Sequence, residues 1–224
     1  MRAPADRRWR FLPLPSALLA ALLAGAVLAP ARAATAEEDF MIAVANDRVG
    51  QVKESLARGM NPNAVDANGD PALFVAARGG NVNTVDVLLA AKANVDARNK
   101  TGDTPIMAAA LAGNLAIVRA LRSRGARLEN AGWTALIYAA TGGHDAIVGY
   151  LLAEGADINA PSPNGTTALM MAVRENKSST VALLIARGAD VNRRNQNGAS
   201  ALDWALRENE KKMAEQLRRA GARD

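Results

Sequence analysis

Residues 164–192 read NGTTALMMAVRENKSSTVALLIARGADVN, and the pattern of this stretch returns along most of the chain. A glycine stands just before the T-x-L step, and the equivalent glycines are separated by 33, 30, 33 and 33 residues. A fixed period near 33 residues predicts stacked supersecondary units rather than one globular core. These glycines are Gly69, Gly102, Gly132, Gly165 and Gly198.

The unit that starts near residue 99 shows how such a unit folds. Thr104 is expected to cap a helix that Pro105 opens, because proline at the first helical position gives up only an amide that has no partner within the helix. Ile106, Ala109 and Ala110 then lie on one face, and the small alanines allow a neighbouring helix to approach closely.

A second helix of the same unit repeats this logic. It places Ile117, Val118 and Leu121 on one face, and Gly125 provides a left-handed stop. Each helix pair therefore has an apolar face that it cannot bury alone, so the units must stack on one another.

These patterns resemble the ankyrin repeat family, whose repeat reads D-x-x-G-x-T-P-L-H-x-A-A, then V-x-x-L-L, then G-A-D-x-N. The resemblance covers roughly residues 37–222. It implies an all-α solenoid of helix-turn-helix units with β-hairpin-like finger loops. The best matches are Asn99, Gly102, Thr104, Pro105, Ile106, Ala109 and Ala110 in one unit, and Val181, Leu183, Leu184, Gly188, Ala189, Asp190 and Asn192 in another.

The chain divides, on this interpretation, into an export signal at residues 1–33 and a repeat domain at residues 34–224. The expected units are residues 37–65, 66–98, 99–129, 130–160, 161–193 and 194–224, and the first and last are caps with polar outer faces. In the second unit Lys92 stands where a glycine is usual. Either a left-handed lysine there costs about 1–2 kcal/mol, or the turn differs.

Residues 1–33 have the layout of a cleavable signal peptide, with arginines first, an apolar run at residues 16–29, and predicted cleavage after Ala33. A retained membrane anchor is the alternative, but Pro13 and Pro15 leave about 14 uninterrupted apolar residues where a spanning helix needs about 20. The pair Arg7-Arg8 leaves the export route open between the Sec and twin-arginine pathways. The signal and the Ala- and Arg-rich composition predict a Gram-negative periplasmic or secreted protein.

The charge of the repeat domain is nearly balanced. The chain has 27 basic and 22 acidic residues, and residues 1–33 hold five arginines and one aspartate, which leaves 22 basic against 21 acidic residues. This balance argues against a nucleic-acid partner. Basic clusters at residues 119–127 and 187–219 are interpreted as solvated surface.

Candidate catalytic and metal-binding residues are few. The chain has no cysteine, which excludes disulfides, thiolate metal sites and a lipid-bearing cysteine at the cleavage point, so no stable membrane anchor is expected after cleavage. The single histidine, His144, is interpreted as a structural hydrogen-bonding residue, and Asp66, Asp157 and Asp190 recur as turn residues. No metal, cofactor or enzymatic activity is therefore predicted.

The finger between the third and fourth units is shorter than the others. Gly125 and Gly132 are seven residues apart, whereas Gly155 and Gly165 are ten apart. Two interpretations stay open: a tolerated loop deletion, or a shortened finger that shapes a pocket beside Trp133.

The resemblance implies that partners meet the finger tips and the concave face of the first helices. The finger positions, between the glycine and the threonine, are Asp70, Asp103, Trp133, Thr166 and Ala199, with Lys100 and Gln196 nearby. The predicted partner-binding residues are Trp133, Leu111, Arg174, Arg78, Thr141, Arg207, Asp103 and Lys100. Tyr138 and Trp204 are interpreted as packing residues.

The sequence thus predicts an exported module that binds another protein. Self-association in a structural assembly is the main alternative, and a large apolar patch on the convex face would favour it. An enzyme is the less favoured third class.

Overall fold

The computed structural model describes residues 35–128 and 132–223, and within these ranges it contains twelve α-helices. The predicted signal peptide at residues 1–33 lies outside the described residues. The only strand-type pairing in the described ranges is an isolated bridge between Val65 and Pro71, which confirms the all-α class. The helices are α1 (Ala36–Ala45), α2 (Val49–Ala57), α3 (Ala72–Gly79), α4 (Val82–Ala90), α5 (Pro105–Leu111), α6 (Leu115–Ser123), α7 (Ala135–Gly142), α8 (Asp145–Ala153), α9 (Ala168–Arg174), α10 (Ser178–Ala186), α11 (Ala201–Arg207) and α12 (Lys211–Arg219).

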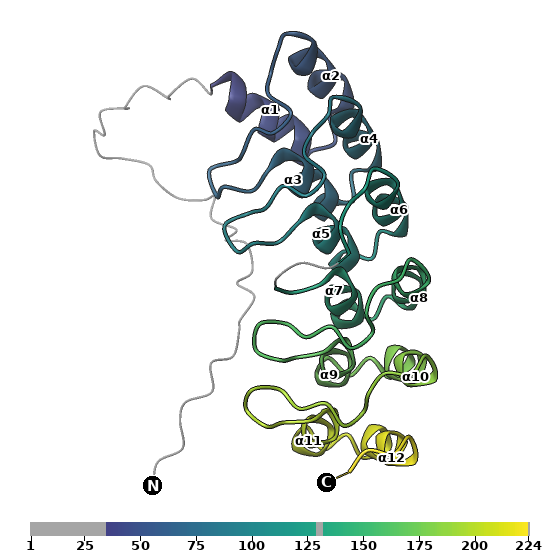
Figure 1. The fold of residues 1–224 in the computed structure, drawn as a ribbon. Helices are drawn as coiled ribbons and strands as arrows, with labels where there is room; N and C mark the ends of the chain where they lie inside the picture. The colour runs from purple at the N-terminus through teal and green to yellow at the C-terminus, as the bar shows by residue number, and fades with distance from the viewer. Residues whose placement is uncertain (1–34, 129–131, 224) are drawn as a thin grey trace, which may run out of the picture. The chain divides into compact units, whose positions relative to one another are not determined.

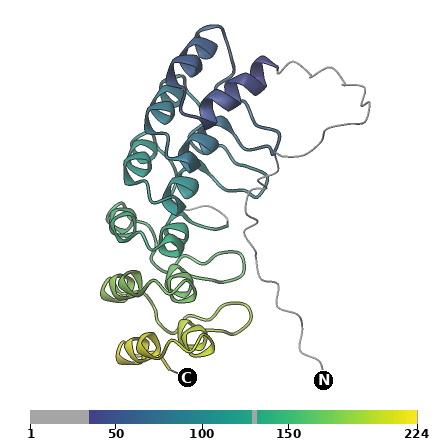
Figure 2. The ribbon, with the colours of Figure 1, turned by 180° about the vertical axis from the view of Figure 1, so that it is seen from behind.

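The helices form two layers of a stack. We call α1, α3, α5, α7, α9 and α11 the inner helices, and the even-numbered helices the outer helices. Each inner helix packs against the inner helices of the neighbouring units and against its own outer partner. The loops that precede α3, α5, α9 and α11 project from the inner side of the stack as fingers (Figure 1), and the reverse view shows the same two layers (Figure 2).

The core runs through all six units because each unit buries its apolar stripe against the next one. The predicted faces of α5 and α6 are confirmed, since their residues have no exposed surface. Alanine on the inner helices allows the close approach of α5 to α3 and α7. The buried predicted residues are Ile106, Ala109, Ala110, Ile117, Val118 and Leu121.

Helix capping follows the prediction in most units but not at Thr104. Thr134 shows the expected bond, because its hydroxyl accepts a hydrogen bond from the Ile137 amide at 3.2 Å. Thr104 also stands at the N-cap of its helix, but its buried hydroxyl has no hydrogen-bond partner among the described residues. The expected cap bond is therefore wrong there, and the Met107 amide donates to the Thr104 carbonyl oxygen at 3.1 Å instead.

The turn after α4 settles the two alternatives for Lys92. Its φ is +63°, and its amide donates to the Leu89 carbonyl oxygen at 3.1 Å. The equivalent Gly125 has φ +89° and donates to the Arg122 carbonyl oxygen at 2.9 Å. The turn is thus the usual one, and the lysine adopts the left-handed conformation.

We expect Lys92→Gly to raise the free energy of unfolding by about 0.5–1 kcal/mol. Glycine removes the left-handed strain of about 1–2 kcal/mol, and part of this gain is offset by the greater freedom of glycine in the unfolded chain. Urea unfolding of the two proteins measures the difference. The control is Lys53→Gly within α2, where the same change should cost about 1 kcal/mol. A loss of stability at both positions would contradict the strain at Lys92.

Candidate functional site

Three of the five finger positions are buried, and none of these three was among the predicted partner-binding residues. Asp70, Thr166 and Ala199 are 8%, 1% and 9% exposed. The reason is local: each of these residues returns the finger to the helix, and its amide is held by a side chain four residues earlier. The Asp70 amide, for example, donates to the Asp66 carboxylate at 2.9 Å, and the Ala199 amide donates to the Asn195 side-chain oxygen at 3.0 Å.

The predicted helix positions lie at the ends of the inner helices, and four of the five line two pockets on the finger side of the stack. The first, here called the N-terminal pocket, has a volume of about 300 Å³. It brings together Arg78, Leu111 and Asp103 from the prediction. Its full lining is Phe74, Arg78, Asp103, Met107, Ala108, Leu111, Ala112 and Tyr138.

The charged groups at the rim of the N-terminal pocket are already paired. Arg78 forms an ion pair with Asp70 at 2.7 Å, and its guanidinium carbon lies 5.4 Å from the ring centre of Phe74. The Asp103 carboxylate accepts hydrogen bonds from the Tyr138 hydroxyl at 2.7 Å and from a threonine hydroxyl of its own finger at 2.6 Å. Leu111 is 43% exposed. The pocket therefore offers an apolar surface with a satisfied polar rim.

Tyr138 has a second role besides the packing that the sequence suggested. It is half-buried against the core, and it also forms one wall of the N-terminal pocket. Burial raises the pKa of its phenol, and the hydrogen bond to the Asp103 carboxylate and the charge of that group raise it further. The Trp133 ring lies 6.1 Å from the Tyr138 ring, so Trp133 supports this wall without lining the pocket itself.

We expect the Tyr138 phenol to titrate above its ordinary pKa of about 10, and the shift to decrease in Asp103→Asn. An absorbance titration on a Tyr150→Phe background isolates this phenol, because the chain has two tyrosines. Since the folded-state pKa is raised, the contribution of Tyr138 to stability is complete below about pH 10 and is lost as the pH rises through the folded-state pKa. A phenol that titrates near pH 10 in both proteins would contradict this assignment.

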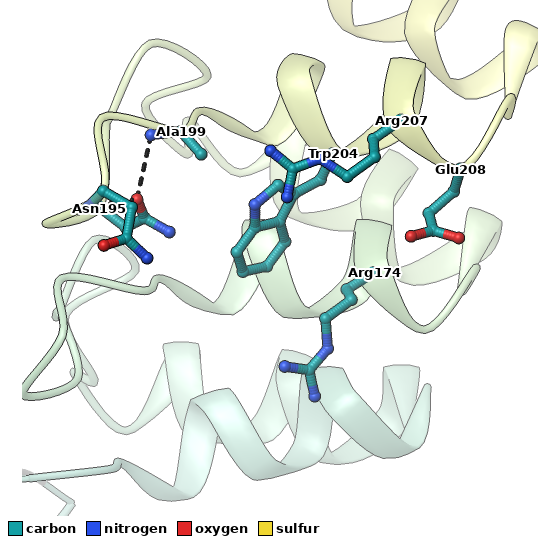
Figure 3. Close-up of a pocket in the computed structure, with 7 residues that line it drawn as sticks. Arg174, Asn195, Ala199, Trp204, Arg207 and Glu208 are labelled. Carbon is teal, nitrogen blue, oxygen red and sulfur yellow. Dashed lines mark hydrogen bonds between the residues drawn. The ribbon is translucent and has the colours of Figure 1, made fainter. Parts of the chain in front are cut away.

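The second pocket, here called the C-terminal pocket, lies between α9, α11 and the finger between them, and has a volume of about 220 Å³. Figure 3 shows Trp204 between Asn195 on one side and the guanidinium groups of Arg207 and Arg174 on the other. Trp204 was interpreted as a packing residue, and it does pack against the core, but it also lines this pocket. The full lining is Arg174, Asn195, Asn197, Ala199, Trp204, Arg207 and Glu208.

Two other predicted residues lie outside both pockets. The Thr141 hydroxyl donates to the Ile137 carbonyl oxygen of its own helix at 2.8 Å. Lys100 is exposed on its finger, and its methylene stem covers Gly69 of the preceding finger, where an added Cβ would lie 2.6 Å from the lysine Cε. The structure thus brings five of the eight predicted residues into the two pockets.

His144 plays the structural role that the sequence suggested. Its Nε2 lies 2.9 Å from the Leu111 carbonyl oxygen of the preceding unit. Asn81, at the same repeat position, donates in the same way to the Val44 carbonyl oxygen at 2.9 Å. The described residues hold no group of three or more His, Cys, Asp and Glu side chains that is arranged to bind a metal ion. None of the helices in the described part of the chain combines the length and the apolar character that crossing a membrane requires.

The basic cluster at residues 119–127 connects units rather than forming an open patch. Arg124 donates to the Leu89 carbonyl oxygen at 3.2 Å, and Arg127 pairs with an aspartate of the second unit at 2.9 Å. On the other side, Arg122 pairs with a glutamate of the fourth unit at 3.1 Å, and Arg119 lies over the Tyr150 ring at 5.1 Å. These arginines therefore hold the third unit to both of its neighbours.

Comparisons with known proteins agree with this geometry. A family model described as ankyrin repeats (3 copies) matches residues 40–131, 85–162 and 155–223. A crystal structure at 1.00 Å resolution of an ankyrin repeat domain from Acinetobacter baumannii AYE is 33% identical in sequence, with a TM-score of 0.71, and the match covers 84% of this chain and 100% of that one. No curated protein matches this chain.

Proposed function

The chain belongs to the ankyrin repeat family, and on that premise we propose that it binds another protein through the face that carries the two pockets. Ankyrin repeats are generally protein–protein interaction modules and are typically not enzymes. The observation that carries the proposal is the convergence of Arg78, Leu111, Asp103, Arg174 and Arg207 on two pockets of one face. Aromatic and arginine side chains beside apolar pockets are the usual composition of interface hot spots.

Recognition by this face requires little backbone movement. Arg78 and the Asp103–Tyr138 pair are held by hydrogen bonds before any partner arrives, so few side chains have to be ordered on binding. Leu111 is the residue that a partner would newly cover, because it is 43% exposed. We place Trp133 behind Tyr138 as a support of the site, and Lys100 and Thr141 on its margin.

The test is a crosslinking pull-down with the full chain from periplasmic extract, run beside Leu111→Ser. We expect a captured protein to be lost in this variant while thermal stability is retained. Leu206→Ser is the matched control, because Leu206 is 46% exposed and lines neither pocket. Capture that survives Leu111→Ser would remove the N-terminal pocket from the interface. Capture of the chain itself alone would favour self-association instead.

We also propose that the protein is exported and acts in the periplasm or outside the cell. The proposal rests on the arginines, the apolar run and the Ala-Arg-Ala end of residues 1–33. Expression of the full chain in a Gram-negative host tests it by N-terminal sequencing of the protein recovered from the periplasmic fraction. A chain that begins at Ala34 supports export and cleavage, and an intact chain that stays in the cytoplasm rejects both.

A further inference from the structure

We propose that the C-terminal pocket binds the carboxylate side chain of an acidic segment of the partner protein. The inference rests on the proposed function, since it names the chemistry of one contact on the same face. It starts from a surplus of hydrogen-bond donors around this pocket.

Asn195 contributes a donor at the edge of the pocket that has no partner within the described residues. The residue is 9% exposed, and its side-chain oxygen accepts hydrogen bonds from the amides of Asn197 and Ala199, both at 3.0 Å. Because both of these partners are donors, the atom that they contact must be the oxygen, which fixes the orientation of the side chain. Its NH₂ group has no hydrogen-bond partner among the described residues, although Asn195 lines the pocket. An unpaired donor that lines a pocket is suited to a ligand that brings an acceptor.

Further donors lie beside it. Within the described residues, neither the Arg207 guanidinium nor the indole N–H of Trp204 has a hydrogen-bond partner, and both residues line the pocket. Arg174 is held by Glu175, with nitrogen–oxygen distances of 3.0 Å. In Figure 3 the Arg207 guanidinium lies beside the Trp204 indole, and the Arg174 guanidinium lies on the side of the indole away from Asn195. An acceptor-only group with a negative charge complements such a set, and a carboxylate is such a group.

The acidic groups around the pocket offset only part of the positive charge, although Asp203 does interact electrostatically with Arg207. Asp203 is paired with Arg194 at 3.1 Å and accepts from the Ser200 amide at 2.7 Å. Glu208 is the one carboxylate in the lining, and in Figure 3 it lies on the side of Trp204 opposite to Asn195. A ligand carboxylate beside Asn195 would therefore meet donors first, with Glu208 as a more distant repulsive group.

The N-terminal pocket and the arginine cluster at residues 119–127 lack this surplus. The charged groups at the rim of the N-terminal pocket are paired within the chain, so that pocket is suited to an apolar side chain. The arginines at residues 119–127 bind neighbouring units. A nearly neutral repeat domain also gives no general attraction for polyanions such as nucleic acids. A side-chain carboxylate of a polypeptide thus fits this pocket better than a phosphate backbone does.

The test uses NMR on the ¹⁵N-labelled full chain, titrated with a synthetic peptide of alternating Glu and Gly that is blocked at both ends. The matching Gln–Gly peptide is the neutral probe. We expect a saturable shift of the Trp204 indole N–H signal with the Glu peptide and at least about 10-fold weaker binding of the Gln peptide, because a hydrogen bond to a charged group is worth more than one to a neutral group. Trp204→Phe assigns the signal, and the Trp133 indole is the internal reference.

Three variants sharpen the result. Arg207→Gln should weaken binding of the Glu peptide by about 10-fold or more, and Glu208→Gln should strengthen it a few-fold, because it removes the repulsive carboxylate. Lys53→Gln makes the same change of charge as Arg207→Gln but lies on α2, so the affinity should stay constant.

In the peptide titrations, the proposal is overturned by equal binding of the two peptides, no effect of Arg207→Gln, movement of the Trp133 signal in place of the Trp204 signal, or no saturable shift. Acetate and inorganic phosphate are titrated in parallel, and if either saturates at the same concentration as the peptide, the pocket is a small-anion site and the assignment is wrong. A pull-down that depends on Leu111 but not on Arg207 would reject this inference and leave the proposed function intact.

Discussion

Replacing Leu136 by Ala is expected to lower the free energy of unfolding by about 3 kcal/mol, since leucine-to-alanine changes in a packed core cost about 2–5 kcal/mol. Leu136 is 2% exposed on α7, which packs against both α5 and α9. The lost methyl groups remove apolar burial and leave a cavity, because the neighbouring helices relax only in part. Urea unfolding followed by circular dichroism measures the loss.

The position of Leu136 adds a second expectation. Stability in a repeat array is close to a sum of unit and nearest-neighbour terms, so a weakened fourth unit should loosen the coupling between the two halves of the stack. On a background in which Trp9 and Trp133 are replaced by Phe, Trp204 fluorescence reports on the last unit and should then depart from the circular dichroism curve. Leu206→Ala is the control, because this leucine is 46% exposed and should cost well under 1 kcal/mol. Equal losses at the two positions would mean that α7 is not part of a close-packed core.

The repeat period of the sequence predicted the helices well because the residues that recur with this period are the ones that the helices bury. The stripe of Ile106, Ala109 and Ala110 has no exposed surface, as the spacing required. The histidine was also predicted correctly, since His144 shares its repeat position with Asn81 and makes the same bond to the preceding unit. Such features repeat in every unit, so each unit supports the interpretation of the others.

The pockets were harder to predict because they are built between units. Asp103 and Tyr138 are separated by 35 residues, and Arg122 and Glu154 by 32, yet each pair forms a direct bond. A side chain therefore contacts side chains that lie about one repeat period away in the sequence. The sequence prediction assigned a role to each repeat position separately and did not consider contacts between neighbouring units. A comparison of residues one repeat period apart would have predicted that Asp103 contacts the Tyr138 side chain of the next unit, and not a binding partner.

A second signal was present in the sequence. Tyr138 and Trp204 occupy the same repeat position, which Val75, Ala108 and Met171 fill in the units between and before them. Where the position holds a small residue, as at Ala108, a neighbouring aromatic ring leaves space, and the N-terminal pocket forms there. The change of residue size at this repeat position, from Ala108 to Tyr138, marks the N-terminal pocket.

The two pockets complement each other chemically. The N-terminal pocket has paired charges around an apolar surface, and the C-terminal pocket has donors without acceptors around Trp204. A partner segment that meets both would need an apolar side chain at one end and an acidic one at the other. The spacing of these anchors, rather than the total contact area, would then decide which proteins bind.

The contact between the last two fingers leads to the second large effect. We expect Gly165→Ala to lower the free energy of unfolding by about 2–3 kcal/mol, because a left-handed alanine costs about 1–2 kcal/mol and a clash adds to it. Gly165 has φ +79°, and an added Cβ would lie 3.1 Å from the Asn195 Cα and 3.2 Å from the Gln196 nitrogen. These are backbone atoms, and the Gln196 amide is itself bound to the Asn164 carbonyl oxygen at 3.0 Å. Neither finger can therefore move away without losing this bond.

Gly198→Ala is the matched control for this prediction. Gly198 has φ +73°, but a Cβ there meets nothing within 4 Å, so its replacement should cost only the backbone strain of about 1–2 kcal/mol. Urea unfolding of the two variants separates the cost of the left-handed backbone conformation from the cost of the steric clash with the neighbouring finger. Because the clash falls on Asn195, Gly165→Ala should also move the side-chain amide signal of Asn195 in NMR spectra, whereas the Trp133 indole signal should stay in place. Equal costs at the two glycines, with the Asn195 signal unmoved, would show that the fingers are not in contact and that the C-terminal pocket is not held in the form described.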